Sequence, residues 1–225
     1  GLITAGVNVF RLNFSHGDAD QHRQRARQIR QLAAHLKTPI GILCDMQGPK
    51  VRIGRFADEQ GIVLADNDEF RLDSTTDPAA GDEHSVFIER GYLDDFAVGD
   101  RVLLDDGRVV LEIAAKTTFA LICRTLTGGV LSSHKGINKF GGGLSAKALT
   151  DKDRRDIKTA ADLGCDYLAV SFVRCASDIE ESRELLTDAG SSAHIIAKIE
   201  RAEAIDEVAL DGIIAAADGI MVARG

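Results

Sequence analysis

Five apolar runs, each of which ends in polar residues, constrain the fold more than any other feature of this 225-residue sequence. The runs occupy residues 7–14, 40–44, 167–173, 195–200 and 220–225. Segments with helical patterns follow them, as in βα units, where the strands are parallel and buried on both faces. Functional residues in such folds lie where the strands end. The polar residues that close these runs are therefore the first candidates for chemistry.

A β-rich segment interrupts this pattern. Residues 18–36 are polar with apolar residues at helical spacing, and a short second strand follows them. From about residue 48 to residue 143, short runs of β-branched and aromatic residues are broken by Gly, Asp and Asn. Asp106-Gly107, between the apolar runs 102–104 and 109–113, predicts a hairpin turn. The triplet Gly141-Gly142-Gly143 predicts the boundary of this all-β insertion.

Helical patterns return after the insertion. Thr150 with Asp153 predicts a capping box, Ser177 with Glu180 predicts a second one, and a glycine ends each helix. The order of elements suits a parallel barrel or an open doubly wound sheet. Because no βα turn carries the Gly-x-Gly-x-x-Gly pattern of a dinucleotide-binding sheet, we favour the barrel.

Five strands cannot close an eight-stranded barrel, so we expect a piece of a larger enzyme. The fold class predicted is α/β, a partial (β/α)8 TIM barrel with an inserted all-β lid domain. We place the barrel domain at residues 1–50 and 144–225, and the lid at residues 51–143.

Composition argues against several classes of partner. The net charge of −8 disfavours a nucleic acid bound by general electrostatics. No run reaches the roughly 18 apolar residues that span a membrane, so we expect no membrane partner. The four cysteines lack paired or metal-ligand spacing, which is typical of thiols in a reducing cytoplasm.

Lys198 and Glu200 close the fourth run. Because side chains alternate along a strand, the two must share one face at its carboxyl end. A carboxylate that binds a hard cation and an ammonium that offsets charge on a transferring group together suit a phosphate and divalent-metal site. An exposed ion pair on the rim is the alternative, which the purely apolar run before it disfavours.

Arg11, Asn13 and Ser15 share a face of the first run by the same alternation. Burying an arginine beside amide and hydroxyl groups is costly unless an anion or a cofactor satisfies it. Asn13 and Ser15 could instead only cap the next helix.

These segments resemble the pyruvate kinase family, in family order over the whole chain. The matching motifs are Arg-Leu-Asn-Phe-Ser-His-Gly at 11–17, Asp-Met-Gln-Gly-Pro-Lys-Val-Arg at 45–52, Asp-Asp-Gly at 105–107, Lys-Gly-Ile-Asn-Lys at 135–139, Leu-Thr-Asp-Lys-Asp at 149–153, Ala-Val-Ser-Phe at 169–172, Ala-Lys-Ile-Glu at 197–200 and Ile-Met-Val-Ala-Arg-Gly at 220–225. The resemblance implies that the chain holds barrel strands two to six and the lid of a cytoplasmic, usually tetrameric enzyme.

The resemblance also implies a function, the transfer of the phosphoryl group of phosphoenolpyruvate to ADP, which gives pyruvate and ATP. Lys198 would stabilise that group in transfer, Glu200 would bind Mg²⁺ or Mn²⁺, and Arg11 would hold the phosphate. Other implied substrate contacts are Ala223, Arg224 and Gly225. The implied nucleotide contacts are Asn13, Phe14, Ser15, His16, Arg52 and Lys135. The family's monovalent-ion site corresponds to Asn13, Ser15, Asp45 and Met46.

Two departures from the family pattern bear on cofactors. Members that need potassium carry glutamate at the position of Lys50, so we predict that the parent enzyme works without potassium. An aspartate that completes the family's metal site would follow Gly225, so we expect the isolated chain to turn over slowly or not at all.

Three further alternatives stay open. Asp106 could reach Arg11 when the lid closes, or could serve only as a turn former. The chain could be a silent binding or structural fragment. It could also derive from a Mg²⁺-dependent aldolase or lyase that acts on a pyruvate enolate, although such an enzyme has no need of a lid over a nucleotide.

Overall fold

The computed structural model describes residues 1–223 and divides the chain into two compact units. The first unit combines the segments before residue 50 and after residue 146, and the second unit is Lys50–Ala146. The sequence interpretation places the changes of pattern at 50/51 and 143/144, close to these limits.

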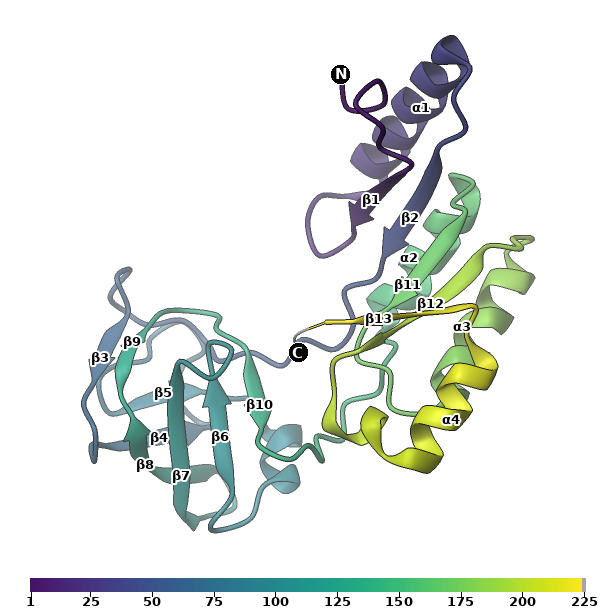
Figure 1. Cartoon of the computed structure of the whole chain (residues 1–225). Coiled ribbons are helices and arrows are strands. Elements are labelled where there is room, and N and C mark those ends of the chain that lie inside the picture. Colours follow the sequence, from purple (N-terminus) through teal and green to yellow (C-terminus); the bar gives the residue numbers. More distant parts are fainter. Residues whose placement is uncertain (224–225) are drawn as a thin grey trace. The chain divides into compact units, whose positions relative to one another are not determined.

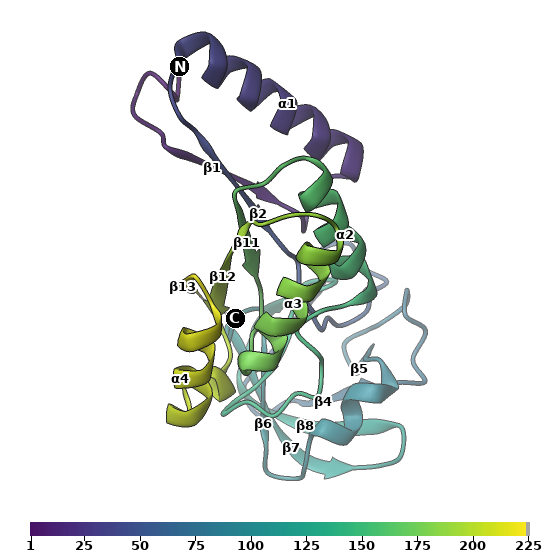
Figure 2. The ribbon, with the colours of Figure 1, turned by 90° about the vertical axis from the view of Figure 1, so that its right-hand side faces the viewer.

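A parallel five-stranded sheet forms the first unit (Figure 1). Its strands lie in the order β1 (Val9–Asn13), β2 (Gly41–Asp45), β11 (Tyr167–Val170), β12 (His194–Ile199) and β13 (Gly219–Val222). The connecting helices are α1 (Ala19–Leu36), α2 (Asp151–Asp162), α3 (Ala176–Asp188) and α4 (Glu207–Ala216), with a short 3-10 helix, η2 (Ala202–Ile205) (Figure 2). Each new strand adds beside the previous one, which gives the curled half-barrel of an α/β barrel domain.

The two faces of this sheet differ in chemistry because side chains alternate along each strand. One set packs on the helices in a single apolar core, with members such as Leu12, Ile42, Leu168 and Ile195 fully or almost fully buried. The polar residues that close the strands lie on the other face. The expected barrel strands are therefore confirmed as parallel strands of βα units, whereas only one face of their sheet is uniformly apolar.

Two aspartates tie neighbouring strands together at their amino ends. Asp166 precedes β11 and accepts the N–H of Ile42 on β2 at 2.6 Å. Asp218 precedes β13 and accepts the N–H of Ile195 on β12 at 2.7 Å. Each carboxylate also pairs with an arginine, Asp166 with Arg30 of α1 at 2.7 Å and Asp218 with Arg183 of α3 at 2.9 Å. This repeated arrangement holds the strand register at the edge opposite the candidate site.

The helices begin and end largely where the sequence predicts. Asp18 caps α1 by accepting the N–H of Gln21. The box of Thr150 and Asp153 at the start of α2 is confirmed, with both reciprocal bonds present. Gly164 follows α2 in the left-handed conformation, with φ +68°.

The second predicted box is wrong. Helix α3 starts at Ala176 with Cys175 as its N-cap, so Ser177 lies inside the first turn. The carboxylate of Asp178 accepts the backbone N–H of Arg174 at 2.9 Å and pairs with its guanidinium at 2.9 Å. An ionic partner therefore fixes this helix start instead of the serine hydroxyl.

The second unit is all-β apart from the 3-10 helix η1 (Arg90–Asp95). A six-stranded sheet has the order β10 (Ile137–Lys139), β6 (Arg101–Leu104), β7 (Val109–Lys116), β8 (Ala120–Thr127), β4 (Glu69–Asp73) and β5 (Ser85–Phe87). A two-stranded sheet pairs β3 (Ile62–Leu64) with β9 (Gly129–Leu131). The predicted hairpin is confirmed, since β6 and β7 are antiparallel across a turn in which Asp105, Asp106 and Gly107 all have positive φ.

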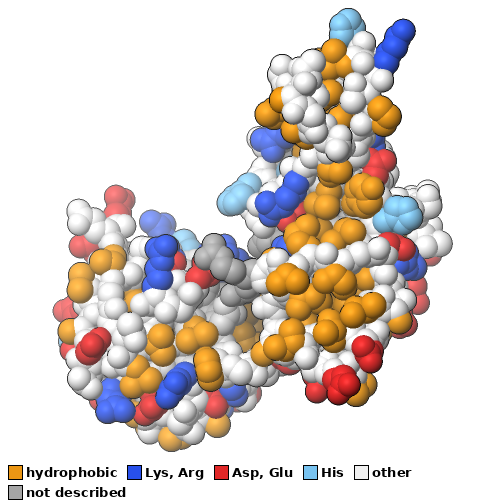
Figure 3. Space-filling view, in the orientation of Figure 1, with side chains coloured by type: hydrophobic (Ala, Val, Ile, Leu, Met, Phe, Trp, Pro, Cys, Tyr) orange, Lys and Arg blue, Asp and Glu red, His pale blue; other side chains and the backbone are white. Residues whose placement is uncertain are grey.

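An apolar surface lies over the part of the first unit that holds α4 and β13 (Figure 3). Its exposed large side chains are Ile205, Val208, Ile214, Ile220 and Val222. A patch of this kind is typical of a face that packs against other protein. Over residues 1–223, no helix combines the length and apolarity required to cross a bilayer.

Candidate active site

Four charged side chains form a cluster at the carboxyl edge of the half-barrel. They are Arg11, Asp45, Lys198 and Glu200. Strand register brings them together, because Asn13 pairs with Asp45 on β2, and Asp45 with Ala169 on β11. Ala169 in turn pairs with Ile196 on β12. Parallel neighbours in register point to the same face, so Arg11, Asp45 and Lys198 share it.

Lys198 is the centre of this cluster. Its Nζ lies 3.0 Å from Glu200 Oε1 and 3.2 Å from Asp45 Oδ1, and it donates to Ser171 Oγ at 2.8 Å. The side chains of Lys198, Glu200 and Asp45 are only 10%, 6% and 2% exposed. The prediction that Lys198 and Glu200 share a face is confirmed, and both lie in a buried cluster and not on an exposed rim.

Arg11 joins the cluster from the solvent side. Its Nε donates to Asp45 Oδ2 at 2.6 Å, and a second guanidinium nitrogen lies 2.5 Å from the same oxygen. The side chain is 55% exposed, so the expectation of a buried arginine is wrong. The carboxylate of Asp45 satisfies the guanidinium, which leaves part of its donor set facing solvent.

The loop between β1 and α1 presents the next expected residues. Asn13 Oδ1 accepts the N–H of Ser15 at 3.0 Å, a local turn bond that leaves the capping of α1 to Asp18. Ser15 and His16 are exposed, while Phe14 is buried. The interpretation of Asn13 and Ser15 as helix caps is therefore wrong.

Contacts with Lys152 and His22 hold this loop in place. The carbonyl of Phe14 accepts Lys152 Nζ at 2.8 Å, and the imidazole of His22 stacks on the Phe14 ring at 4.1 Å between centroids. Burial, assisted by Arg25, lowers the pKa of His22. A neutral ring at this position favours stacking over ion pairing.

The expected residues of the second unit also group together. Lys135 Nζ lies 2.9 Å from Asp105, and the guanidinium of Arg52 donates to the carbonyl of His134 at 2.5 Å. Asp106 and Lys50 are exposed. The role of Asp106 in lid closure stays a prediction.

At the end of β13, Ala223 donates its N–H to the carbonyl of Ile199 at 3.2 Å. Register pairs Ile199 with Val222, so Ala223 lies beside Glu200. Arg224 and Gly225 lie outside the described residues.

A divalent cation fits this cluster through Glu200. Its carboxylate is a hard oxygen donor, and Mg²⁺ is commonly bound by one or two carboxylates together with water and substrate phosphate. Among residues 1–223 no group of three His, Cys, Asp or Glu is placed to hold a metal ion. A metal ion bound by Glu200 would therefore need further oxygen ligands besides those of the described residues.

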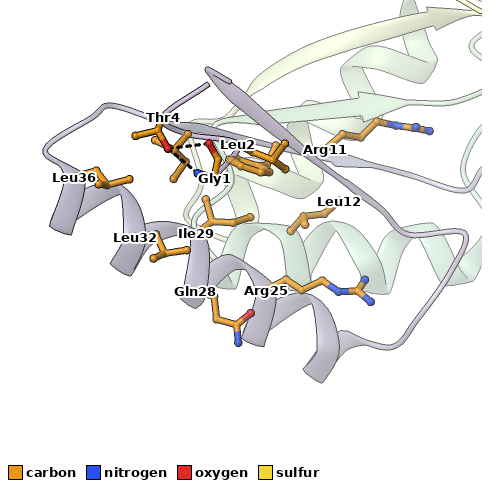
Figure 4. Close-up of a pocket in the computed structure, with 12 residues that line it drawn as sticks. Gly1, Leu2, Thr4, Arg11, Leu12, Arg25, Gln28, Ile29, Leu32 and Leu36 are labelled. Atoms are coloured by element: carbon orange, nitrogen blue, oxygen red, sulfur yellow. Dashed lines mark hydrogen bonds between the residues drawn. The ribbon is translucent and has the colours of Figure 1, made fainter. Parts of the chain in front are cut away.

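A separate cavity of about 570 Å³ lies between β1 and α1 (Figure 4). Its lining is mainly apolar, from Leu2, Ile3, Phe10, Leu12, Ile29, Leu32 and Leu36. The charged end of Arg11 points away from it in Figure 4. Arg11 is among the residues that line the cavity, so the cavity adjoins the charged cluster through the aliphatic part of this side chain.

Sequence reasoning missed two parts of the cluster. The family resemblance places Asp45 only in a monovalent-ion site. In the structure its carboxylate pairs with both Arg11 and Lys198. Ser171, which bonds the ammonium, was given no role. Its place directly after β11, at the carboxyl end of an apolar run, was a usable signal.

A curled parallel α/β sheet with buried charged groups at its carboxyl edge defines a barrel-type enzyme domain. The sequence matches the family described as "Pyruvate kinase, barrel domain" over residues 1–225. The chain belongs to the pyruvate kinase family.

Relatives agree with this assignment. The chain is 49% identical to "Pyruvate kinase II" of Salmonella typhimurium and 47% identical to "Pyruvate kinase" of Buchnera aphidicola, in each case over 100% of this chain and 47% of the relative. It is 39% identical to "Pyruvate kinase" of Mycobacterium tuberculosis, with the same coverage. The chain spans about half the length of the curated relatives it matches.

Proposed function

We propose that the protein that carries this chain transfers the phosphoryl group of phosphoenolpyruvate to ADP, giving pyruvate and ATP. The cluster of Lys198, Glu200, Asp45 and Arg11 is the observation that carries this proposal. Phosphoryl transfer needs positioning and charge neutralisation more than covalent help from the protein, and this cluster supplies both kinds of charge.

Each residue has a separate task. Lys198 is held by three oxygen partners, so its ammonium can offset charge that develops on the phosphoryl group without reorganising. Arg11 places its exposed donors where a phosphate can bind them, because Asp45 fixes its orientation. Glu200 would hold Mg²⁺ or Mn²⁺, which supplies charge compensation and a template for the phosphate oxygens.

For the nucleotide, we propose contacts from Asn13, Phe14, Ser15 and His16, with Arg52 and Lys135 contributed by the β-rich unit acting as a lid. The exposure of Ser15 and His16 supports this. Ala223 would contact the substrate, together with Arg224 and Gly225. The parent protein is proposed to be a cytoplasmic homotetramer.

Potassium dependence can be tested through Lys50. We infer that the parent enzyme works without added potassium, because a lysine replaces the glutamate of potassium-dependent members. The assay compares initial rates in potassium-free and potassium-containing buffers at equal ionic strength. Activation by an order of magnitude would contradict this inference.

The test of the main proposal is a coupled assay for pyruvate on the full-length protein, with phosphoenolpyruvate, ADP and Mg²⁺. Lys198→Met should lower kcat by at least about 100-fold, the loss typical of removing one stabilising charge at a transition state. Lys158→Met is the matched control, because Lys158 lies exposed on α2. Pyruvate formation that does not require ADP would favour the lyase alternative. A wild-type protein that forms no pyruvate would refute the proposed kinase activity.

The same assay on the isolated 225-residue chain addresses the alternative of a silent fragment. We expect no turnover, because the metal site contributed by its described residues is incomplete. A rate close to that of the full-length protein would contradict that expectation.

A further inference from the structure

The segment between β11 and α3 contacts both Lys198 and Glu200. Ser171 is 2% exposed, and its Oγ accepts Lys198 Nζ at 2.8 Å while donating to the carbonyl of Met46 at 2.7 Å. The hydroxyl therefore uses one donor and one acceptor function in a fixed direction. It connects the ammonium to the backbone that leaves β2.

Phe172 adopts a backbone conformation that is unfavourable for its residue type. Its φ is +56°, in the left-handed region, where the Cβ of a non-glycine residue crowds the following carbonyl oxygen. In this conformation its N–H donates to Glu200 Oε2 at 2.9 Å. Since Lys198 faces Oε1 at 3.0 Å, both oxygens of this carboxylate are held. Strain of this kind persists where the surroundings impose it, often at functional sites.

Gly48 is the third member of this arrangement. A Cβ at this position would lie 2.7 Å from Phe172 Cδ2 and 3.0 Å from the Cβ of Ser171. Its N–H donates to Asp153 Oδ1 at 3.0 Å, and Asp153 is fully buried in the capping box of α2. Only glycine lets the chain after β2 pack this closely on Ser171 and Phe172.

We propose that Ser171 and Phe172 are positioning residues for the reaction, and that Gly48 permits the packing that holds them. Ser171 orients the ammonium of Lys198, and the N–H of Phe172 orients the carboxylate of Glu200. This inference rests on the proposed function, and it adds a specific consequence. Changes in the segment Met46–Gly48 should alter the rate of the chemical step more than the binding of substrates.

The first test replaces Ser171 by alanine in the full-length protein. A shift of about 1 Å in a catalytic group can cost on the order of 100-fold in rate, so we expect kcat to fall by about 10- to 100-fold. The KM values for phosphoenolpyruvate and ADP should change by less than about twofold, because an interaction made mainly in the transition state affects kcat.

Ser182 is the matched control. It lies in the same unit, is fully buried, and donates its hydroxyl to the carbonyl of Asp178 within α3 at 2.8 Å. Ser182→Ala removes an equally buried hydroxyl that does not contact Lys198, so its kcat should stay at the wild-type value. Both variants are compared by circular dichroism and by melting temperature before kinetics.

The second test uses glycine. Gly48→Ala and Gly164→Ala impose the same backbone strain, since both glycines have φ +68°, but a Cβ at Gly164 meets no atom within 4 Å. Gly48→Ala should lower kcat and raise the Mg²⁺ concentration for half-maximal activity, because Glu200 loses its fixed orientation. Gly164→Ala should change neither.

The outcomes separate this inference from the proposed function. A wild-type protein that forms no pyruvate would refute the function itself. An active wild type with Ser171→Ala as active as Ser182→Ala would overturn the positioning role. If Gly48→Ala does not fold, the serine pair still decides the question.

Discussion

Asp45→Asn is expected to destabilise the first unit, because Asp45 neutralises a buried ammonium. Its side chain is 2% exposed and lies 3.2 Å from Nζ of Lys198, whose side chain is 10% exposed. At that distance, with an effective dielectric constant of about 20, the attraction is about 5 kcal/mol. The asparagine keeps the shape of the side chain and removes its charge.

The net loss is smaller than this attraction. Burying the carboxylate of Asp45 has its own cost, and removing one partner of a buried pair typically costs about 3–5 kcal/mol. Lys198 keeps Glu200 and Ser171 as partners, so we expect the lower end, about 3 kcal/mol. Arg11 is 55% exposed, and its lost pair adds at most about 1 kcal/mol.

The assay is urea unfolding at pH 7, followed by circular dichroism. If the free energy of unfolding falls by about 3 kcal/mol per molar urea, the urea concentration at the unfolding midpoint should decrease by about 1 M. Asp20→Asn is the control, because Asp20 is 94% exposed and its pair with Arg23 lies on the surface. A midpoint within about 0.3 M of the wild type for Asp45→Asn would refute the reasoning.

Three other predictions concern pH, thiols and ligand binding. The N–H of Ile195 donates to the carboxylate of Asp218 and holds its pKa below the usual value. The ionised carboxylate therefore stabilises the folded state above the unfolded pKa of about 3.9, and this stabilisation disappears as the pH falls through the folded pKa. Asp218→Asn should therefore cost about 1 kcal/mol in urea unfolding at pH 7, and a difference that does not shrink as the pH falls below about 3.9 would contradict this. Burial raises the pKa of Cys123 to about 12, so iodoacetamide at pH 8 should modify the partly exposed Cys175 and leave Cys123 unmodified, as read by peptide mass spectrometry. Calorimetry on the full-length protein should show that Mg²⁺ tightens phosphoenolpyruvate binding, with Glu200→Gln reducing this coupling; equal affinity with and without Mg²⁺ would argue against Glu200 as the metal ligand.

Alternation and strand ends were enough to predict much of the fold. The apolar runs became parallel strands, and the two-residue spacing of Lys198 and Glu200 became one shared face. These features are local, since they depend only on the period of a strand and on its direction.

Features that depend on competing side-chain partners could not be read in the same way. The start of α3 follows a local ion pair between Arg174 and Asp178, four residues apart, which competes with the serine cap that the sequence favoured. The exposure of Arg11 depends on Asp45, a residue on the neighbouring strand. Long-range partners of this kind override local propensity.

The charge balance of the site depends on those long-range partners. Arg11 and Lys198 carry two formal positive charges, while Asp45 and Glu200 carry two negative ones, so the cluster is formally neutral. A phosphate ester alone would add negative charge, and a divalent cation alone would add positive charge, each at a cost in a buried site. The two together restore the balance. In the proposed function, the carboxylate that Arg11 and Lys198 share would therefore do more than support the fold, because it would set the charge at which a phosphate and a metal ion bind most favourably as a pair.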